Sequence, residues 1–345
     1  MGDTRSYETG TLLVGDCLQR LAELPTGSFD AVVTDPPYFR VAGEAWDRQW
    51  EDRATFITWL GEVLAECHRL LKPTGSLYVF ASPQLSAYVQ VEIGKRFHVL
   101  NEVVWQKPDG FHKRSSREAL RTFHSGETER LIFAEPVHDS TPGCDTSRQY
   151  KNKDHDAAAE VYEPLRTYLV QARDAAGYTT AQVNKALGFA GMAGHWFSAS
   201  QWVLPSEDNY NSLVKLFGAA LPRTYADVRA EYDRLRVQWE ARRRYFDLGP
   251  DRAERPSGTV WRFAGDREWE GRHPCQKPVP LLRHIIATSV RPGETVLDPF
   301  MGSGTTAVAA IMEGVRWVGC EAAEKYLAHF DRRVKGAEGA QQALL

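Results

Sequence analysis

Short apolar runs alternate along this chain with segments whose apolar residues recur every three to four positions, which predicts alternating strands and helices. In the first third we expect strands at 11–14, 29–33, 76–81, 99–105 and 129–134, and helices at 18–24, 56–71 and 85–95. The same alternation returns towards the C-terminus, with strands at 295–298 and 316–319 and helices at 279–289, 307–312 and 324–335. This order is typical of an α/β fold built on a mostly parallel sheet.

Between these two regions, residues 136–256 follow a different pattern. Residues 136–156 are polar and predict a linker, and helices are expected at 163–176, 180–187 and 222–245, with a further apolar segment at 192–202. Helix, glycine turn and helix in succession are similar to a helix-turn-helix, although the same pattern occurs in helical modules that bind no DNA. The arginines of the last helix are partly offset by acidic residues, so a solvated face remains the alternative.

Composition and charge narrow the class of protein. The 345 residues are 43% apolar and 25% charged, with a net charge of −3, which is globular composition and a mild argument against nonspecific nucleic-acid binding. The five cysteines form no CxxC pair, so neither a metal site nor a disulfide framework is indicated. No apolar run reaches the length of a membrane span and no secretory pattern opens the chain, so we expect a cytoplasmic protein without a membrane partner.

A short turn after the second predicted strand carries the first chemical motif, Asp35-Pro36-Pro37-Tyr38. The two prolines fix φ near −65° and lack an N–H, so the strand must end there in a stiff turn. Such a turn can receive a flat ring that bears an exocyclic amine: Tyr38 stacks on the ring, while Asp35 and the Pro36 carbonyl accept the amine hydrogens. An Asp-Pro-Pro turn after any strand is the alternative.

A second motif lies far along the chain, where Thr295 to Asp298 predicts a buried strand followed by Pro299-Phe300-Met301-Gly302-Ser303-Gly304 and a helix. Glycines let the backbone approach a ligand closely, and the helix N-terminus offers free N–H groups. Glu321, at the end of the next strand, suits ribose hydroxyls. The loop lacks both the third glycine of the dinucleotide fingerprint and the lysine of a P-loop, which favours a ligand with a ribose but no phosphates.

Together these motifs resemble those of the β class of DNA amino-methyltransferases, in which the catalytic motif precedes the cofactor loop. His273 to Pro278 is similar to the segment that leads into that loop. The resemblance covers roughly 220 residues at both ends of the chain. It implies a circularly permuted, Rossmann-like α/β methyltransferase sheet, seven-stranded, mixed and mostly parallel. It also implies a catalytic part at 1–135, an inserted α-rich target-recognition module at 136–256 and a cofactor-binding part at 257–345.

The resemblance further implies S-adenosyl-L-methionine as cofactor, double-stranded DNA as substrate and methylation of the exocyclic amine of a flipped base, with adenine N6 favoured. It leaves open a homodimer and a partner restriction endonuclease. The catalytic residues would be Asp35, Pro36, Pro37 and Tyr38. The cofactor would contact Asp16, Asp35, Lys277, Asp298, Pro299, Phe300, Gly302, Ser303, Gly304, Thr305 and Glu321, with Asp16 at its adenine end and Lys277 near its methionine carboxylate. No metal is needed.

A basic segment, residues 107–128, separates two of the predicted strands and contains few apolar residues. It carries Lys107, Lys113, Arg114, Arg117 and Arg121, which we expect to contact DNA phosphates. A solvated loop without a ligand is the alternative.

Other functions remain open beside adenine methylation. Cytosine-N4 methylation uses the same chemistry and is the main rival. Pro274-Cys275-Gln276 is similar to the nucleophile motif of cytosine-C5 methyltransferases, but there the motif follows the cofactor loop instead of preceding it. Glutamine and guanine-N2 methyltransferases usually carry Asn where Asp35 stands. A DNA-binding regulator with an inactive methyltransferase domain is the alternative from another class.

Overall fold

The computed structural model describes residues 3–41, 43–107, 127–137, 146–199, 202–249, 256–265 and 275–343, with 146–159 and 241–242 described by their backbone alone. The chain forms two compact units, one from Met1–Pro142 with Arg244–Leu345 and the other from Gly143–Arg243. Each unit has its own buried core.

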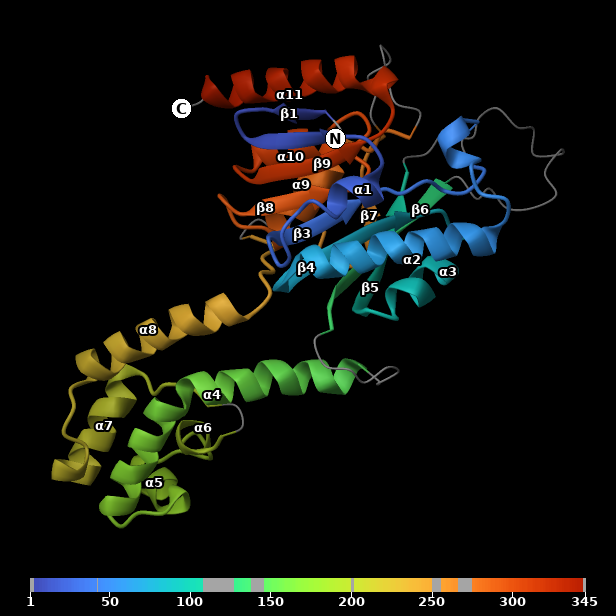
Figure 1. Cartoon of the computed structure of the whole chain (residues 1–345). Helices are drawn as coiled ribbons and strands as arrows, with labels where there is room; N and C mark the ends of the chain where they lie inside the picture. Colours follow the sequence, from blue (N-terminus) through green and yellow to red (C-terminus); the bar gives the residue numbers. More distant parts are fainter. Residues whose placement is uncertain are drawn as a thin grey trace. The chain divides into compact units, whose positions relative to one another are not determined.

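The first unit is built on one mixed sheet, and in Figure 1 the strands β1, β9, β8, β3 and β4 follow one another from top to bottom. Its strands are β1 (Thr4–Ser6), β2 (Gly10–Val14), β3 (Phe29–Thr34), β4 (Leu71–Ala81), β5 (Phe97–Gln106), β6 (Thr128–Pro136), β7 (Val260–Arg262), β8 (Thr295–Asp298) and β9 (Arg316–Glu321). Their order across the sheet is β1-β2-β9-β8-β3-β4-β6-β5-β7. The pairs β2–β9, β9–β8, β8–β3, β3–β4 and β5–β7 are parallel.

The α/β fold with a mixed, mostly parallel sheet is therefore confirmed, and all seven expected strands are present. The strand count of seven is too low, because β1 and β7 extend the described sheet to nine strands. Both are edge strands of three residues, too short to give an apolar pattern. The strand expected at 76–81 begins earlier, because β4 starts at Leu71, which pairs with Phe29.

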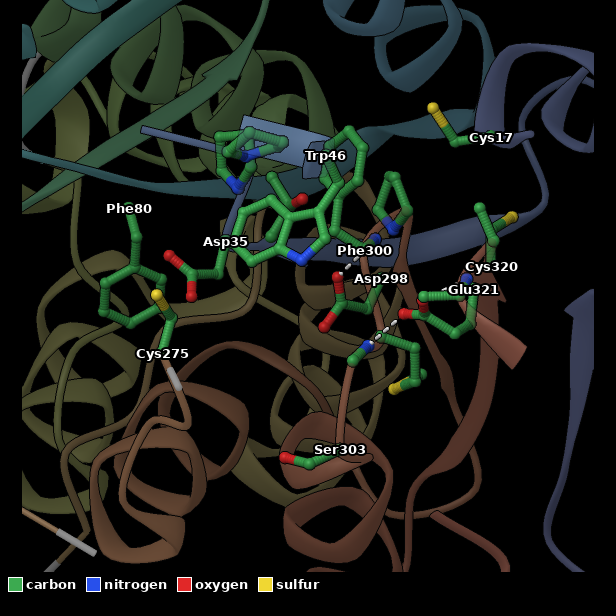
Figure 2. Close-up of a pocket in the computed structure, with 18 of the residues that line it drawn as sticks. Cys17, Asp35, Trp46, Phe80, Cys275, Asp298, Phe300, Ser303, Cys320 and Glu321 are labelled. Atoms are coloured by element: carbon green, nitrogen blue, oxygen red, sulfur yellow. Dashed lines mark hydrogen bonds between the residues drawn. The ribbon is translucent and has the colours of Figure 1, made fainter. Parts of the chain in front are cut away.

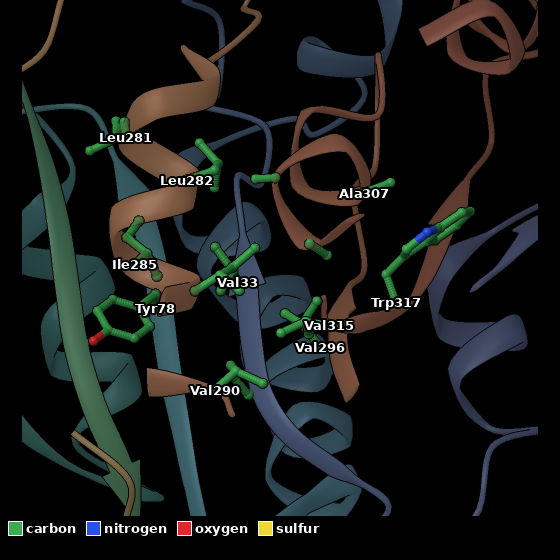
Figure 3. Close-up of a cluster of buried hydrophobic side chains, with 14 of the residues drawn as sticks. Val33, Tyr78, Leu281, Leu282, Ile285, Val290, Val296, Ala307, Val315 and Trp317 are labelled. Carbon is green, nitrogen blue, oxygen red and sulfur yellow. The ribbon is translucent and has the colours of Figure 1, made fainter. Parts of the chain in front are cut away.

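Helices cover both faces of the sheet. On one face α1 (Cys17–Leu21), α2 (Arg53–Leu70) and α3 (Ser86–Ile93) pack on strand residues such as Val32. On the other, α9 (Val279–Ser289), α10 (Thr305–Met312) and α11 (Leu327–Gln342) pack on residues such as Val33. Because successive side chains of a strand point to opposite faces, the fully buried run in β3 supplies both cores. Figure 3 shows Val33 among Leu282, Ile285 and Val296.

The second unit consists of helices around a separate core that contains Leu165, Leu169 and Tyr210. Its helices are α4 (Thr146–Ala175), α5 (Thr180–Leu187), α6 (Gly194–Phe197), α7 (Glu207–Phe217) and α8 (Tyr225–Arg242). Thr179 caps α5 through a capping box, and the helix ends at Gly188, whose φ is +73°.

Two expectations for this region need correction. The linker expected at 136–156 is partly helical, because α4 begins at Thr146 and its polar first turns hid the helix from the apolar pattern. Among the described residues of the apolar segment 192–202, only Gly194–Phe197 are helical, and Trp196 and Phe197 there are buried in the core of the unit.

Candidate active site

The two sequence motifs meet at one edge of the sheet in the first unit. Strand β8 lies between β3 and β9, parallel to both, so the residues that follow their carboxyl ends gather at the same edge. A cavity of about 230 Å³ lies there. Its lining includes most of the expected site residues: Asp16, Asp35, Pro36, Pro37, Tyr38, Lys277, Asp298, Pro299, Phe300, Gly302, Ser303, Thr305 and Glu321. Figure 2 shows Asp35, Asp298 and Glu321 around this cavity together with Trp46.

Asp298 and Glu321 hold the backbone of the glycine loop. Asp298 accepts the N–H of Phe300 on Oδ1 at 3.0 Å and the hydroxyl of Thr306 on Oδ2 at 2.5 Å. Glu321 accepts the N–H of Gly302 on Oε2 and that of Ala323 on Oε1, both at 2.7 Å (Figure 2). Since each carboxylate oxygen has a second acceptor position, Glu321 can still accept hydrogen bonds from a ligand in the cavity.

Burial raises the pKa of Asp298 to about 7, even though Thr306 and the Phe300 N–H lower it. The pKa of Glu321 is also raised by burial, against the effect of its backbone donors.

Two glycines of the loop have backbone conformations that other residues disfavour. Gly302 has a φ of +54° and Gly304 a φ of +81°, the left-handed region that side chains disfavour. Gly304 also packs against Phe330, because a Cβ built on it would lie 2.7 Å from Cδ2 of that ring. Gly304 is the cap residue of α10 and is the one expected loop residue that does not line the cavity.

Asp35 follows β3 and is paired with a buried lysine. Its Oδ2 accepts from Nζ of Lys277 at 2.5 Å, and both side chains line the cavity. Oδ1 of Asp35 is buried and finds no hydrogen-bond partner among the described residues. A buried acceptor without a partner costs about 1–3 kcal/mol, so this oxygen favours a ligand that brings a donor.

Asp35 and Lys277 belong to a larger charged network that the sequence did not reveal. Glu129, near the start of β6, accepts from the Tyr38 hydroxyl at 2.9 Å and contacts Nζ of Lys277 at 3.2 Å and Nζ of Lys107 at 2.7 Å. Burial would raise the pKa of Glu129, but the two lysines outweigh it and lower the pKa to about 2. Burial would likewise lower the pKa of Lys277, but Asp35 and Glu129 raise it. Lys277 therefore stays charged.

The loop after Asp35-Pro36-Pro37-Tyr38 also contributes to the cavity. Phe39 and Arg40 have positive φ values of 49° and 63°, a strained conformation outside glycine that often marks functional sites. Arg40 holds it by donating its N–H to the Asp47 carbonyl at 2.8 Å. Trp46, Asp47 and Gln49 of this loop line the cavity, and none of them was expected there. Nζ of Lys325 donates to Glu44 at 2.5 Å and ties the loop to the segment after β9.

Other expected residues lie elsewhere. Lys107 pairs with Glu129, and its side chain is 16% exposed. Lys113, Arg114, Arg117 and Arg121 lie outside the described residues, as do His273 and Pro274. Cys275 lines the cavity, but burial and the charge of Asp35 raise its pKa to about 11, whereas a nucleophilic thiol requires a lowered pKa.

Within the described part of the chain no group of three or more His, Cys, Asp or Glu side chains could hold a metal ion. In the same residues no helix is both long and apolar enough to cross a bilayer. Lys277 is the one basic side chain among the described residues that line the cavity, and it is already paired with two carboxylates. The cavity thus suits a ligand without phosphate groups.

Comparison with known proteins shows the family of this chain. The family model described as DNA methylase, for N6- and N4-specific enzymes, matches residues 29–332, which include both motifs. The chain belongs to this family. One relative, the DNA adenine methyltransferase YhdJ of Escherichia coli (strain K12), is 28% identical over 329 residues, covering 93% of this chain and 81% of the relative.

One solved DNA methyltransferase has a similar fold. The PvuII DNA methyltransferase, described as cytosine-N4-specific, is 13% identical and matches with a TM-score of 0.52 over 97% of this chain and 93% of its own. A complex of M1.HpyAVI with S-adenosylmethionine is 16% identical and matches with a TM-score of 0.48 over 94% of this chain and 98% of its own. The resemblance to DNA amino-methyltransferases expected from the motifs is confirmed by the family match.

Proposed function

We propose that this DNA methylase transfers a methyl group from S-adenosyl-L-methionine to N6 of an adenine flipped out of double-stranded DNA. The observation that carries the proposal is the meeting of two motifs in one cavity. Asp35, with its unpartnered Oδ1, and Tyr38 lie at the end of β3, beside the glycine loop that follows β8.

The glycine loop and its acidic neighbours fit the cofactor. When bound, S-adenosyl-L-methionine supplies an activated methyl group on sulfur. Glu321 has free acceptor positions for ribose hydroxyls, and Gly302, which lines the cavity and has no Cβ, lets a ligand approach the loop backbone. Phe300 offers an aromatic wall that is held by Trp59, whose ring centroid lies 5.6 Å away.

The catalytic motif suits a flat base with an exocyclic amine. An amine paired within the duplex cannot be approached, so the base must leave the stack. Tyr38 offers a ring for stacking, Oδ1 of Asp35 accepts one amine hydrogen and the Pro36 carbonyl accepts the other. Both acceptors direct the nitrogen lone pair towards the methyl group, and this orientation lowers the barrier without a covalent enzyme intermediate.

The choice of adenine rests on the motif Asp35-Pro36-Pro37-Tyr38 and on the named activity of the E. coli relative. Cytosine N4 is the second candidate, because the same two acceptors fit its amine and because the PvuII enzyme of similar fold is cytosine-N4-specific.

The remaining parts are proposed to bind DNA. The helical unit 143–243 is the candidate for sequence recognition, and Lys113, Arg114, Arg117 and Arg121 are candidates for phosphate contacts. Phosphate contacts orient a protein on the duplex, and base contacts provide specificity.

Mass spectrometry of nucleosides would test the proposal directly. Plasmid DNA is incubated with the purified chain and S-adenosyl-L-methionine, digested and searched for N6-methyladenine and N4-methylcytosine, with Asp35→Ala as the inactive control. N6-methyladenine that requires Asp35 is expected. N4-methylcytosine would replace the adenine assignment with the second candidate, and the absence of both modified nucleosides would refute methylation of DNA amines.

A further inference from the structure

Glu129 makes three contacts in the site, although nothing in its sequence context marks it as functional. Its side chain is 14% exposed, and it lies in the second position of β6. Its two oxygens contact Tyr38, Lys277 and Lys107 at 2.9, 3.2 and 2.7 Å. Tyr38 and Lys277 are the neighbours of Asp35 in the cavity, so Glu129 joins the two groups that flank the catalytic carboxylate.

The sheet brings these partners together from distant positions. In the β5–β6 pairing Trp105 lies opposite Glu129, and the Lys107 N–H donates to the Glu127 carbonyl at 2.9 Å, which sets Lys107 beside Glu129. Tyr38 comes from the turn after β3, and Lys277 from the segment before α9. A residue fixed in a strand is a more rigid anchor than a loop residue, and both the Tyr38 turn and the Lys277 segment lie outside regular elements.

We propose that Glu129 is a positioning residue for methyl transfer: it holds Lys277 against Oδ2 of Asp35 and fixes the ring of Tyr38 for stacking on the target base. The inference rests on the proposed function. With Lys277 engaged by both carboxylates, Oδ1 of Asp35 is left for the amine, and the Tyr38 side chain cannot swing away from the cavity without breaking its hydrogen bond to Glu129.

Charge balance supports this arrangement. The network contains two carboxylates, Asp35 and Glu129, and two ammonium groups, Lys277 and Lys107. Nζ of Lys277 also lies 5.0 Å from the Tyr38 ring centroid and 5.1 Å from that of Phe80, so the cation is held by aromatic faces as well. Removal of the Glu129 charge would leave Lys277 with one anion and an excess positive charge beside the base site.

Several titratable groups act on Asp35 and Glu129. Asp35 interacts electrostatically or by hydrogen bonds with Lys277, Tyr38, Glu129, Cys275 and Asp298. Glu129 interacts in the same way with Lys277, Lys107, Tyr38 and Cys275. Among them, the negative charge of Glu129 raises the pKa of Asp35 and adds to the effect of burial. Loss of that charge lowers the pKa of Asp35. If Asp35 must be ionised for transfer, the acid limb of the pH profile of kcat then moves to lower pH.

The same strand provides a matched control in Glu135. Glu135 is 19% exposed, contacts His98 at 3.3 Å and Arg244 at 3.2 Å, and does not line the cavity. Glu129→Gln and Glu135→Gln therefore remove the same charge from largely buried ion pairs on β6, and a merely structural role predicts similar effects.

The experiment compares kcat, KM for a DNA duplex, the Kd of S-adenosyl-L-methionine and the pH profile of kcat. We expect Glu129→Gln to lower kcat on the order of 10- to 100-fold, as misplacement of a reacting group does. The Kd for the cofactor should stay within a few-fold and the acid limb should move to lower pH, while Glu135→Gln keeps the parent kcat and profile. Equal losses in both variants, or an unmoved acid limb in Glu129→Gln, would overturn the proposal.

A crystal structure of Glu129→Gln separates this inference from the proposed function. If the parent chain methylates no DNA amine, the proposed function fails by itself. The displacement of Lys277 and Tyr38 from their positions around Asp35 is still expected in the variant, and unchanged positions would refute the role of Glu129.

Discussion

Gly304 offers a quantitative test of how tightly the glycine loop after β8 is built. We consider Gly304→Ala, which adds a single methyl group at the start of α10. Two costs arise there, one from the φ of +81° and one from the contact with Phe330, whose Cδ2 and Cε2 would lie 2.7 and 2.9 Å from the new Cβ.

The two costs can be separated with a control. A side chain in the left-handed region costs about 1–2 kcal/mol, and forcing a methyl group into a packed core costs about 1–3 kcal/mol. Gly304→Ala should therefore lower the free energy of unfolding by about 2–5 kcal/mol. Gly293 has a φ of +84° with nothing within 4 Å of its built Cβ, so Gly293→Ala should show the first cost alone, about 1–2 kcal/mol.

Urea denaturation followed by circular dichroism gives the two free energies, and calorimetry gives the affinity for S-adenosyl-L-methionine. We expect the extra loss in Gly304→Ala together with weaker cofactor binding, because the loop must shift away from Phe330. Equal destabilisation in the two variants would refute the reasoning, because Phe330 would then move away from the new methyl group at no cost in free energy.

Three further predictions concern other parts of the chain. Asp35→Ala should abolish methyl transfer while the Kd of S-adenosyl-L-methionine changes only a few-fold; activity close to the parent would remove Asp35 from the mechanism. Because the pKa of Asp298 is raised to about 7, the stability that its protonated form provides is complete below about pH 4 and is lost as the pH rises through 7. In Asp298→Asn, the free energy of unfolding from urea denaturation should therefore fall less between about pH 4 and pH 7 than in the parent. The same fall in both proteins would contradict this prediction. Deletion of residues 178–202 should erase preference among DNA sequences in binding assays and spare cofactor binding, and retained preference would move recognition elsewhere.

Local motifs account for what the sequence predicted well. The two prolines after Asp35 end β3 by their own chemistry, and the strand, glycine loop and helix around Asp298 lie within about twenty residues, so their pattern shows directly. The helix expected at 279–289 has those bounds in the structure, because Pro278 and Pro280 mark its start and its apolar residues follow one pattern.

The part that could not be predicted depends on contacts between distant segments. Glu129 resembles any acidic residue at the start of a strand, and only the pairing of β5 with β6 sets Lys107 beside it. Lys107 itself was assigned to a basic segment because several residues after it are basic. That local pattern does not indicate a contact with Glu129, twenty-two positions away. The start of α4 was missed for a related reason, since its first turns carry no apolar stripe.

The adjacency of β3 and β8 has a consequence for how the protein is made. Asp35 and Asp298 lie 263 positions apart, yet they end neighbouring parallel strands in the middle of the sheet. During synthesis, β3 and β4 leave the ribosome early. The edge of β3 that pairs with β8 then stays unpaired until almost the whole chain has emerged. Pairings of such long sequence separation form slowly, and an exposed strand edge can pair with another chain. Aggregation of the nascent protein should therefore depend on how fast the segment between β4 and β8 is translated.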